Sequence, residues 1–124
     1  MKKEEKNWLM QAERDMKSAK NSFKSKDYYL ASFLCHQVVE KALKSLYIKK
    51  MGKIYRTHDL VFLSKTLSLP EELIESCQRL NPAYIEARYP DAGDELPAFS
   101  YTKEDAESDI KDAEKVLEWI KKVK

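Results

Sequence analysis

The sequence predicts an all-α protein, folded as an antiparallel up-and-down bundle of four long helices plus one short helix. Apolar residues recur at steps of three and four over most of the chain, which is the period of a helix with one buried face. Only two glycines and four prolines occur among the 124 residues, too few for a turn-rich β fold. Short connections between the helical patterns favour antiparallel neighbours, and we expect a single domain over residues 1–124.

The first helix is expected over residues 3–23 and the second over residues 28–51. Apolar residues of the first helix follow one another at steps of three and four: Leu9, Ala12, Met16, Ala19 and Phe23. The second helix lies between Asp27, a residue type favoured at the N-cap, and Gly52, a natural C-cap. One half of its helical wheel is apolar, and the other half mixes charged and aromatic side chains.

The remaining helices are marked by their end residues. Thr57 is expected to cap a short third helix over residues 58–67. Pro70 suits the first position of the fourth helix, because the backbone N–H that proline lacks would have no partner there. Pro82 interrupts the apolar pattern of that helix, so we expect a kink or a restart at this point. A loop follows, and Thr102 caps the fifth helix.

Composition and motifs exclude several classes of protein. A net charge of +2 is too small for nucleic-acid binding through bulk electrostatics, and DNA is not an expected partner. The sequence shows no signal peptide and no apolar run near the roughly 20 residues of a membrane span, so we expect a cytoplasmic protein without membrane contact. Glycine-rich phosphate loops, metal motifs and nucleophile motifs are missing from the sequence, so no metal and no cofactor are expected. Cys35 and Cys77 lie on apolar stripes, where free cysteine packs as a small hydrophobe.

Positive charge gathers in one segment of the sequence. Its basic residues lie close together: Lys41, Lys44, Lys49, Lys50, Lys53 and Arg56. No acidic residue occurs between Glu40 and Asp59, whereas acids concentrate in residues 91–109. A charge run is usually solvated surface. Two sharper interpretations stay open, a phosphate-binding patch and a surface complementary to the acidic region of a second copy.

Polar residues of the second helix and the two histidines are further candidates. The mixed face of this helix, with His36, Gln37, Glu40 and Tyr47, indicates either contact with a partner subunit or ordinary packing inside the bundle. His36 and His58 can each titrate near neutral pH. Neither histidine stands beside a nucleophile or base motif, so the sequence alone does not favour direct catalysis.

Arg88 and Tyr89 form the last candidate group. An arginine at a helix end with an adjacent tyrosine is suited to holding a phosphate or a base. Pro90 follows directly, so the same residues are also consistent with an ordinary helix C-terminus whose carbonyls Arg88 meets.

Three segments in this order resemble the HEPN domain: "DYYLASFLCHQVVEKALKSLYI", "THDL" and "LNPAYIEARYPD". The resemblance extends from about Trp8 to Trp119. It implies an antiparallel bundle of four or five helices, similar to the C-terminal domain of kanamycin nucleotidyltransferase. It also implies a homodimer, a nucleotide ligand and a separate small nucleotidyltransferase as partner, sometimes in a toxin–antitoxin pair.

The resemblance and the residue patterns described above together indicate a site. The candidates for binding nucleotide or phosphate are Lys41, Lys44, Arg56, His58, Arg88 and Tyr89. The polar face of the second helix, or partner contact, would comprise His36, Gln37, Glu40 and Tyr47. If these segments converge in the fold, the basic segment and Arg88 would surround one polar cleft.

One departure from the family pattern shapes the functional interpretation. Ribonuclease members carry an arginine followed by four to six residues and a histidine in the late helices, whereas no histidine follows Arg88 here. We therefore interpret the chain as a non-catalytic binding module that acts with a nucleotidyltransferase, with no catalytic residue, and leave RNA binding open. The alternatives are a ribonuclease toxin with a displaced catalytic histidine, His36 or His58, and a plain homodimeric interaction bundle.

Overall fold

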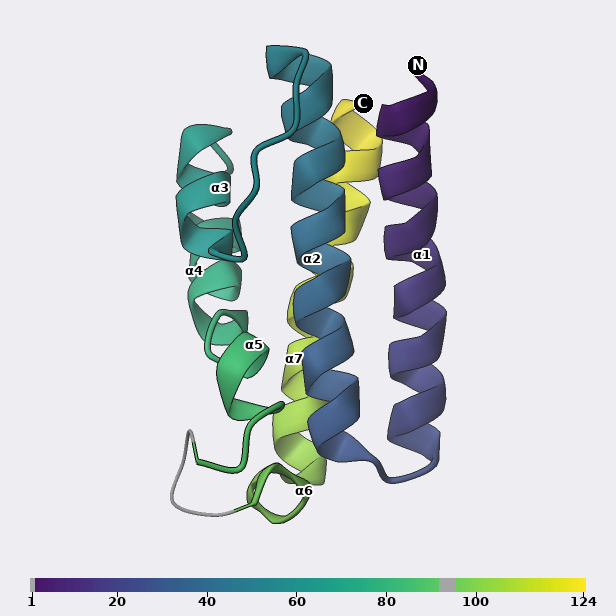
Figure 1. Cartoon of the computed structure of the whole chain (residues 1–124), viewed down its shortest axis with the longest axis vertical. Coiled ribbons are helices and arrows are strands. Elements are labelled where there is room, and N and C mark those ends of the chain that lie inside the picture. The colour runs from purple at the N-terminus through teal and green to yellow at the C-terminus, as the bar shows by residue number, and fades with distance from the viewer. Residues whose placement is uncertain (1, 92–95) are drawn as a thin grey trace.

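The computed structural model describes residues 2–91 and 96–124, so Asp94 and Glu95 of the acidic region lie outside the described residues. The helices are α1 (Lys3–Lys24), α2 (Tyr28–Met51), α3 (Leu60–Thr66), α4 (Glu71–Leu80), α5 (Ala83–Glu86), α6 (Pro97–Ser100) and α7 (Lys103–Val123). No strand occurs in these two ranges. The longer helices run alternately up and down, and both termini lie at the same end of the molecule (Figure 1). The predicted all-α bundle is therefore confirmed.

Helix α2 is the centre of the bundle. It packs against α1 and α7, and α3, α4, α5 and α6 contact its remaining surface. The apolar residues that it buries are Ala31, Cys35, Val38, Val39, Ala42, Leu43, Leu46, Tyr47 and Ile48. Each fully buried large aliphatic side chain stabilises the fold by about 1.5–3 kcal/mol. Cys35 and Cys77 are free and buried, and burial raises the pKa of both thiols, so they act as packing groups.

The start of α3 differs from the predicted start. Asp59, not Thr57, is the N-cap residue, because its carboxylate accepts hydrogen bonds from the backbone N–H groups of Val61 and Phe62. Thr57 lies two residues too early to reach these groups, and its hydroxyl oxygen accepts from the backbone N–H of Asp59 instead. The helix consequently begins at Leu60 rather than at residue 58. The predicted N-cap was wrong. Residues 58 and 59, which were expected in the first turn of the helix, are not helical and lead into α3 instead.

Pro82 divides the fourth helical segment in two. Helix α4 ends at Leu80 and α5 begins at Ala83, because proline has no N–H to continue the helical hydrogen bonds. Asn81 at the joint accepts a hydrogen bond from the backbone N–H of Leu60 and donates one to Asp59 Oδ1, at 2.9 and 3.0 Å. Through these two hydrogen bonds, Asn81 connects the end of α4 to the start of α3. At the other end of α4, Pro70 occupies the N-cap position, one residue before its predicted place.

Two N-cap residues that the sequence indicated behave differently. Thr102 caps α7 in a full capping box, in which its hydroxyl accepts from the backbone N–H of Asp105 and its own N–H donates to the Asp105 carboxylate. Asp27 stands at the N-cap position of α2, but its side chain makes no capping hydrogen bond. None of the helices in the described part of the chain is long and apolar enough to span a membrane.

Replacing Thr102 by Ala should lower the free energy of unfolding by about 1 kcal/mol, because the backbone N–H of Asp105 in the first turn of α7 loses the hydroxyl oxygen that accepts its hydrogen bond. Asp27→Ala is the matched control and should change stability by less than about 0.5 kcal/mol, since its side chain caps nothing. Urea unfolding followed by circular dichroism measures both values. Equal losses in the two variants would contradict the capping assignment.

Candidate functional site

The mixed face of α2 is covered at its centre by the chain itself. After Gly52 the chain turns back along α2, and residues 53–59 lie against this face (Figure 1). The ring of Tyr55 meets that of Tyr47 edge-on at 5.7 Å between centroids. Closer to the start of α2, the ring centroid of Phe33 lies 6.4 Å from that of Tyr84 in α5. Packing inside the bundle, one of the two interpretations of this face, therefore accounts for its central part.

His36 is a buried, neutral anchor. Its Nε2 lies 2.9 Å from the backbone carbonyl oxygen of His58. A carbonyl only accepts, so Nε2 carries the proton and Nδ1 accepts from the amide of Gln37 at 3.3 Å. Burial lowers the pKa of His36 to about 4, although the Glu40 carboxylate opposes this shift. The side chain thus holds the backbone of His58 in place and is not accessible to a ligand.

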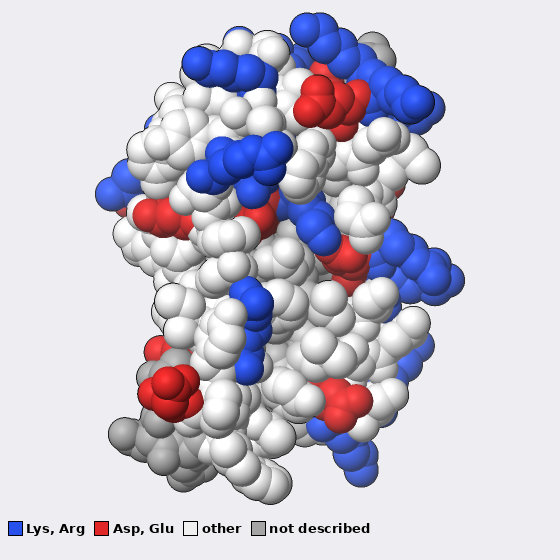
Figure 2. Space-filling view, viewed as in Figure 1, with Lys and Arg blue, Asp and Glu red and all other residues white. Residues whose placement is uncertain are grey.

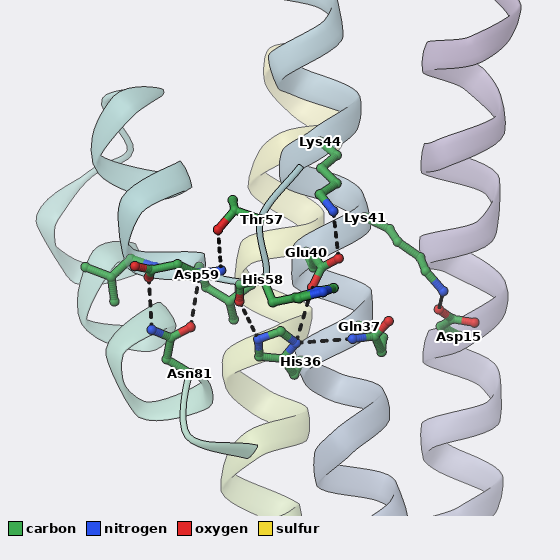
Figure 3. Close-up of polar contacts among 12 residues, drawn as sticks. Asp15, His36, Gln37, Glu40, Lys41, Lys44, Thr57, His58, Asp59 and Asn81 are labelled. Carbon is green, nitrogen blue, oxygen red and sulfur yellow. Dashed lines mark hydrogen bonds and ion pairs between the residues drawn. The ribbon is translucent and has the colours of Figure 1, made fainter. Parts of the chain in front are cut away.

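His58 is the exposed histidine, and its ring is held in one orientation. Its Nδ1 lies 2.9 Å from Glu40 Oε1, and because a carboxylate only accepts, Nδ1 is the donor (Figure 3). The second oxygen of Glu40 accepts from Lys44 Nζ at 2.8 Å. Tyr84 stacks on the imidazole at 4.0 Å between centroids, with 16° between the planes. In the neutral ring Nε2 therefore carries the lone pair, on a side chain that is 53% exposed.

Arg88 extends this arrangement with a positive charge. Its guanidinium carbon lies 4.8 Å from the centroid of Tyr84, 4.9 Å from that of Tyr89 and 5.4 Å from that of Phe33. Cation–π contacts of this kind hold a guanidinium near aromatic rings while its N–H groups stay free to bind anions. His58, Tyr84 and Arg88 therefore form a continuous row of imidazole, phenol ring and guanidinium.

A pocket of about 530 Å³ opens beside this row. Its lining residues are Thr57, His58, Asp59, Asn81, Pro82, Tyr84, Ile85 and Glu86. The backbone N–H of Phe62 and the amide of Asn81 lower the pKa of Asp59, so this carboxylate is ionised. Among these described lining residues there are two carboxylates and no lysine or arginine. The pocket alone therefore offers hydrogen bonding and an aromatic wall, but no fixed positive charge.

The structure divides the predicted binding residues into two groups. Lys41 pairs with Asp15 of α1, and the buried Lys44 pairs with Glu40 and lies 5.4 Å from the ring of Trp8 (Figure 3). These two ammonium groups are occupied within the protein. His58, Arg88 and Tyr89 are brought together around Tyr84. His36 and Glu40 each bond to His58, and Gln37 bonds to His36. Tyr47 lies further along α2, against Tyr55.

Most of the remaining basic segment is exposed. On the face drawn in Figure 2, basic side chains gather toward the end that carries both termini. Lys49 donates to the backbone carbonyl of Lys124, and Lys50 to that of Leu67. Arg56 is exposed two residues before His58. Within the described residues, no group of three or more potential metal ligands forms a site.

Tyr84 and Asn81 are the residues that sequence reasoning missed. Tyr84 is the ring shared by His58 and Arg88, and Asn81 joins α3 to α4. The spacing of four residues between Tyr84 and Arg88 was a signal, because residues four apart lie on one face of a helical turn. Asn81 gave none, since its two partners lie more than twenty positions away.

A second group with a shifted pKa lies on α7. Burial raises the pKa of Asp109 to about 6, and the neighbouring Asp112 and Asp105 act in the same direction. The pKa of Asp109 is raised and that of His36 is lowered, so the two groups have opposite effects on how stability changes with pH. Asp109 contributes stability that is full below its ordinary pKa of 3.8 and is lost as pH rises through about 6. His36 contributes stability that is full above pH 6.5 and is lost as pH falls toward about 4.

Asp109→Asn should therefore make stability more dependent on pH. The contribution of His36 is then no longer offset, and the free energy of unfolding should fall by about 3 kcal/mol between pH 6.5 and pH 4. Wild type and the exposed control variant Glu104→Gln should change less over this range. Urea unfolding at a series of pH values tests this, and identical profiles for Asp109→Asn and wild type would contradict it.

Comparison with known proteins gives relatives of nearly the same length. A protein of Methanocaldococcus jannaschii named "Putative toxin MJ1304" is 36% identical over 128 residues, which cover 92% of this chain and 84% of the relative. The crystal structure of TT1696 from Thermus thermophilus has a TM-score of 0.92 at 32% identity, with 98% of both chains covered. ST0689, described as an archaeal HEPN homologue, has a TM-score of 0.82 at 33% identity, with 97% of both chains covered.

A more distant structure supports the fold alone. A HEPN domain protein of Thermotoga maritima has a TM-score of 0.75 at 24% identity, with 94% of this chain and 96% of the other covered. The family model of the HEPN domain matches residues 5–123, which include every residue of the site described above. This chain belongs to the HEPN domain family.

Proposed function

We propose that this protein is a HEPN module that binds a nucleotide without transforming it and acts with a separate small nucleotidyltransferase. The observation that carries the proposal is the row of His58, Tyr84 and Arg88 beside a pocket large enough for a small ligand. A guanidinium held against rings, next to an imidazole with a free nitrogen, is suited to phosphate oxygens. Rings at the same place are suited to a nucleobase.

Different residues would contact different parts of the ligand. The Arg88 guanidinium and the Nε2 of His58 would meet the phosphate, and the half-exposed ring of Tyr89 would stack on the base. Glu40 would act through His58 as a positioning residue, since it fixes the imidazole by a hydrogen bond of 2.9 Å. Lys41 and Lys44 would not touch the ligand, because their ammonium groups already pair with Asp15 and Glu40.

The proposed assembly is a homodimer that pairs with the nucleotidyltransferase, as one half of a toxin–antitoxin pair. The name of the 36% identical relative from Methanocaldococcus jannaschii supports the toxin side of this proposal. Family membership supports a module of this class, because the match covers residues 5–123. A tagged pull-down from the source cells, analysed by mass spectrometry, should recover a nucleotidyltransferase in stoichiometric amount. Recovery of this chain alone would overturn the pairing.

Arg88→Gln should weaken nucleotide binding about tenfold, because a charge-assisted hydrogen bond contributes about 1.5–3 kcal/mol. Isothermal titration with ATP and GTP at millimolar concentration measures the change. Lys111→Gln is the matched control, since Lys111 is an exposed cation on α7 and should leave affinity unchanged. Wild-type protein, alone and with its partner, that binds neither nucleotide would contradict the proposal.

A second function is favoured by one contact, the hydrogen bond from His58 Nδ1 to Glu40. A carboxylate that orients an exposed imidazole is a typical arrangement for a general base. In a ribonuclease, His58 Nε2 would take the proton of a 2′-hydroxyl, whose oxygen would attack the adjacent phosphorus and release the 5′-oxygen of the next nucleotide. Arg88 would face the phosphate oxygens during this step. Because the chain lacks the arginine–histidine motif of nuclease members, the ribonuclease function ranks second.

His58→Gln should abolish RNA cleavage under this second function, with a loss of about 10²–10⁴-fold in rate. Incubation of purified protein with a synthetic single-stranded RNA, followed by gel electrophoresis, is the measurement. Circular dichroism of the variant checks that the bundle is intact, and Lys111→Gln serves again as the control. RNA that stays intact with wild-type protein over a long incubation rules the ribonuclease function out.

A further inference from the structure

The pocket beside His58 and the row of side chains next to it differ in charge. Asp59 and Glu86 line the pocket, and its described lining includes no lysine or arginine. Arg88 lies on the row, against Tyr84, and is not part of that lining. A phosphate inside the pocket would face two carboxylates, which repel it. The phosphate of a bound nucleotide therefore belongs at Arg88, and an uncharged part of the ligand belongs in the pocket.

Asp59 has one carboxylate oxygen that the fold does not use. Its Oδ1 accepts three hydrogen bonds, from the backbone N–H groups of Val61 and Phe62 and from the amide of Asn81, at 3.0, 3.1 and 3.0 Å. Within the described ranges, no donor bonds Oδ2. The bonds from Phe62 and Asn81 also lower the pKa of Asp59, so the carboxylate is ionised. Oδ2 is thus a charged acceptor left for a ligand.

Thr57 supplies a donor in the same pocket lining. Its hydroxyl oxygen accepts from the backbone N–H of Asp59 at 3.2 Å, and its proton has no acceptor among the described residues. A hydroxyl group of a ligand both donates and accepts, so it can bond Asp59 Oδ2 and Thr57 at once. A guanine base would donate to both oxygens of one carboxylate, but Oδ1 already has three donors. Thr57 and Asp59 therefore suit a hydroxyl group.

We propose that Asp59 determines specificity for the sugar of the nucleotide, whose 2′-hydroxyl donates to Asp59 Oδ2 and accepts from Thr57. This inference rests on the proposed function and deepens it, since it assigns ribonucleotides as the ligand class. Phosphate would be held at Arg88 and at the Nε2 of His58. Because Asp59 directly follows His58 in the chain, it would meet the adjacent part of the ligand, the ribose. Tyr84, which also lines the pocket, would pack against the sugar carbons.

The same arrangement would discriminate against a 2′-deoxyribonucleotide. A deoxy sugar would displace water from Asp59 Oδ2 without offering it a donor, and an ionised acceptor without a partner is costly. A site built to hydrogen-bond a hydroxyl group rejects the analogue that lacks it for this reason. The charge of Asp59 also repels the phosphates, but it does so equally for both sugars. The ratio of the two affinities therefore reports the hydroxyl contact alone.

Isothermal titration of wild type with ATP and 2′-deoxy-ATP, and with GTP and 2′-deoxy-GTP, tests the assignment. Each ribonucleotide should bind at least about tenfold more tightly than its deoxy counterpart, and the ratio should be similar for the two bases. Asp59→Ser should bring both ratios below about threefold, because serine keeps an oxygen that can cap α3 but has no second oxygen. Thr57→Val, which removes the hydroxyl at similar volume, should lower the ratios without changing the cap.

Asp27→Ser is the matched control. Asp27 also stands at an N-cap position, is exposed and makes no capping hydrogen bond, and it is not part of the pocket lining. This variant should keep the ratios of wild type. Circular dichroism checks that each variant has the helix content of wild type.

The outcomes separate this inference from the proposed function. Wild type that binds neither ATP nor GTP would overturn both. Wild type that binds ribonucleotides and deoxyribonucleotides within about twofold of each other would overturn the sugar contact and leave the nucleotide site standing. A preference that Asp59→Ser retains in full, with a native circular dichroism spectrum, would overturn the role of Asp59, as would ratios in Thr57→Val equal to those of wild type for the role of Thr57.

Discussion

The buried carboxylate of Glu40 is the group on which the arrangement of the site depends. A charge removed from water is tolerated only when it is paired and hydrogen-bonded, and Glu40 is only 4% exposed. Lys44 of the same helix satisfies one oxygen and His58 the other. The second bond crosses from α2 to the loop that follows it, so the carboxylate determines where residues 53–59 lie.

The rest of the site follows from that position. His36 holds the backbone of His58 from below, and Tyr84 covers the ring from α5. Asp59, next in the chain, caps α3 and bonds Asn81, which sets the end of α4 and the break before α5. Helices α3, α4 and α5 are therefore joined to α2 through a short polar chain of contacts as well as through the apolar core.

The bundle could be predicted from the sequence more fully than the site. The limits of α2 followed from local signals, since Gly52 has a positive φ of 74° that favours glycine at a helix end. The ion pairs and the burial of the lysines did not follow from local signals. Lys44 stands one turn after Glu40, but the sequence could not show that the loop would bury this pair. Asn81 and Tyr84 depend on contacts between distant segments, which local spacing does not encode.

The two candidate functions draw on the same residues for different reasons. As a binding module, the protein needs the Arg88 charge and a fixed imidazole. As a nuclease, it needs the lone pair of His58 and the carboxylate behind it. His36 serves neither directly, because burial keeps it neutral and out of reach of a ligand. Its part in either function is to hold the His58 backbone, and the two histidines are therefore not interchangeable.

The long-range bonds of His58 also have a consequence for the order of folding. Helices α1 and α2 are neighbours in the chain and form their hairpin from nearby segments, which is entropically inexpensive. The bonds from His36 and Glu40 close loops of 22 and 18 residues, and those of Asn81 close loops of 21 and 22. We therefore expect the row of His58, Tyr84 and Arg88 to assemble after the α1–α2 hairpin, so that a chain with most of its helix formed would still lack this arrangement of side chains.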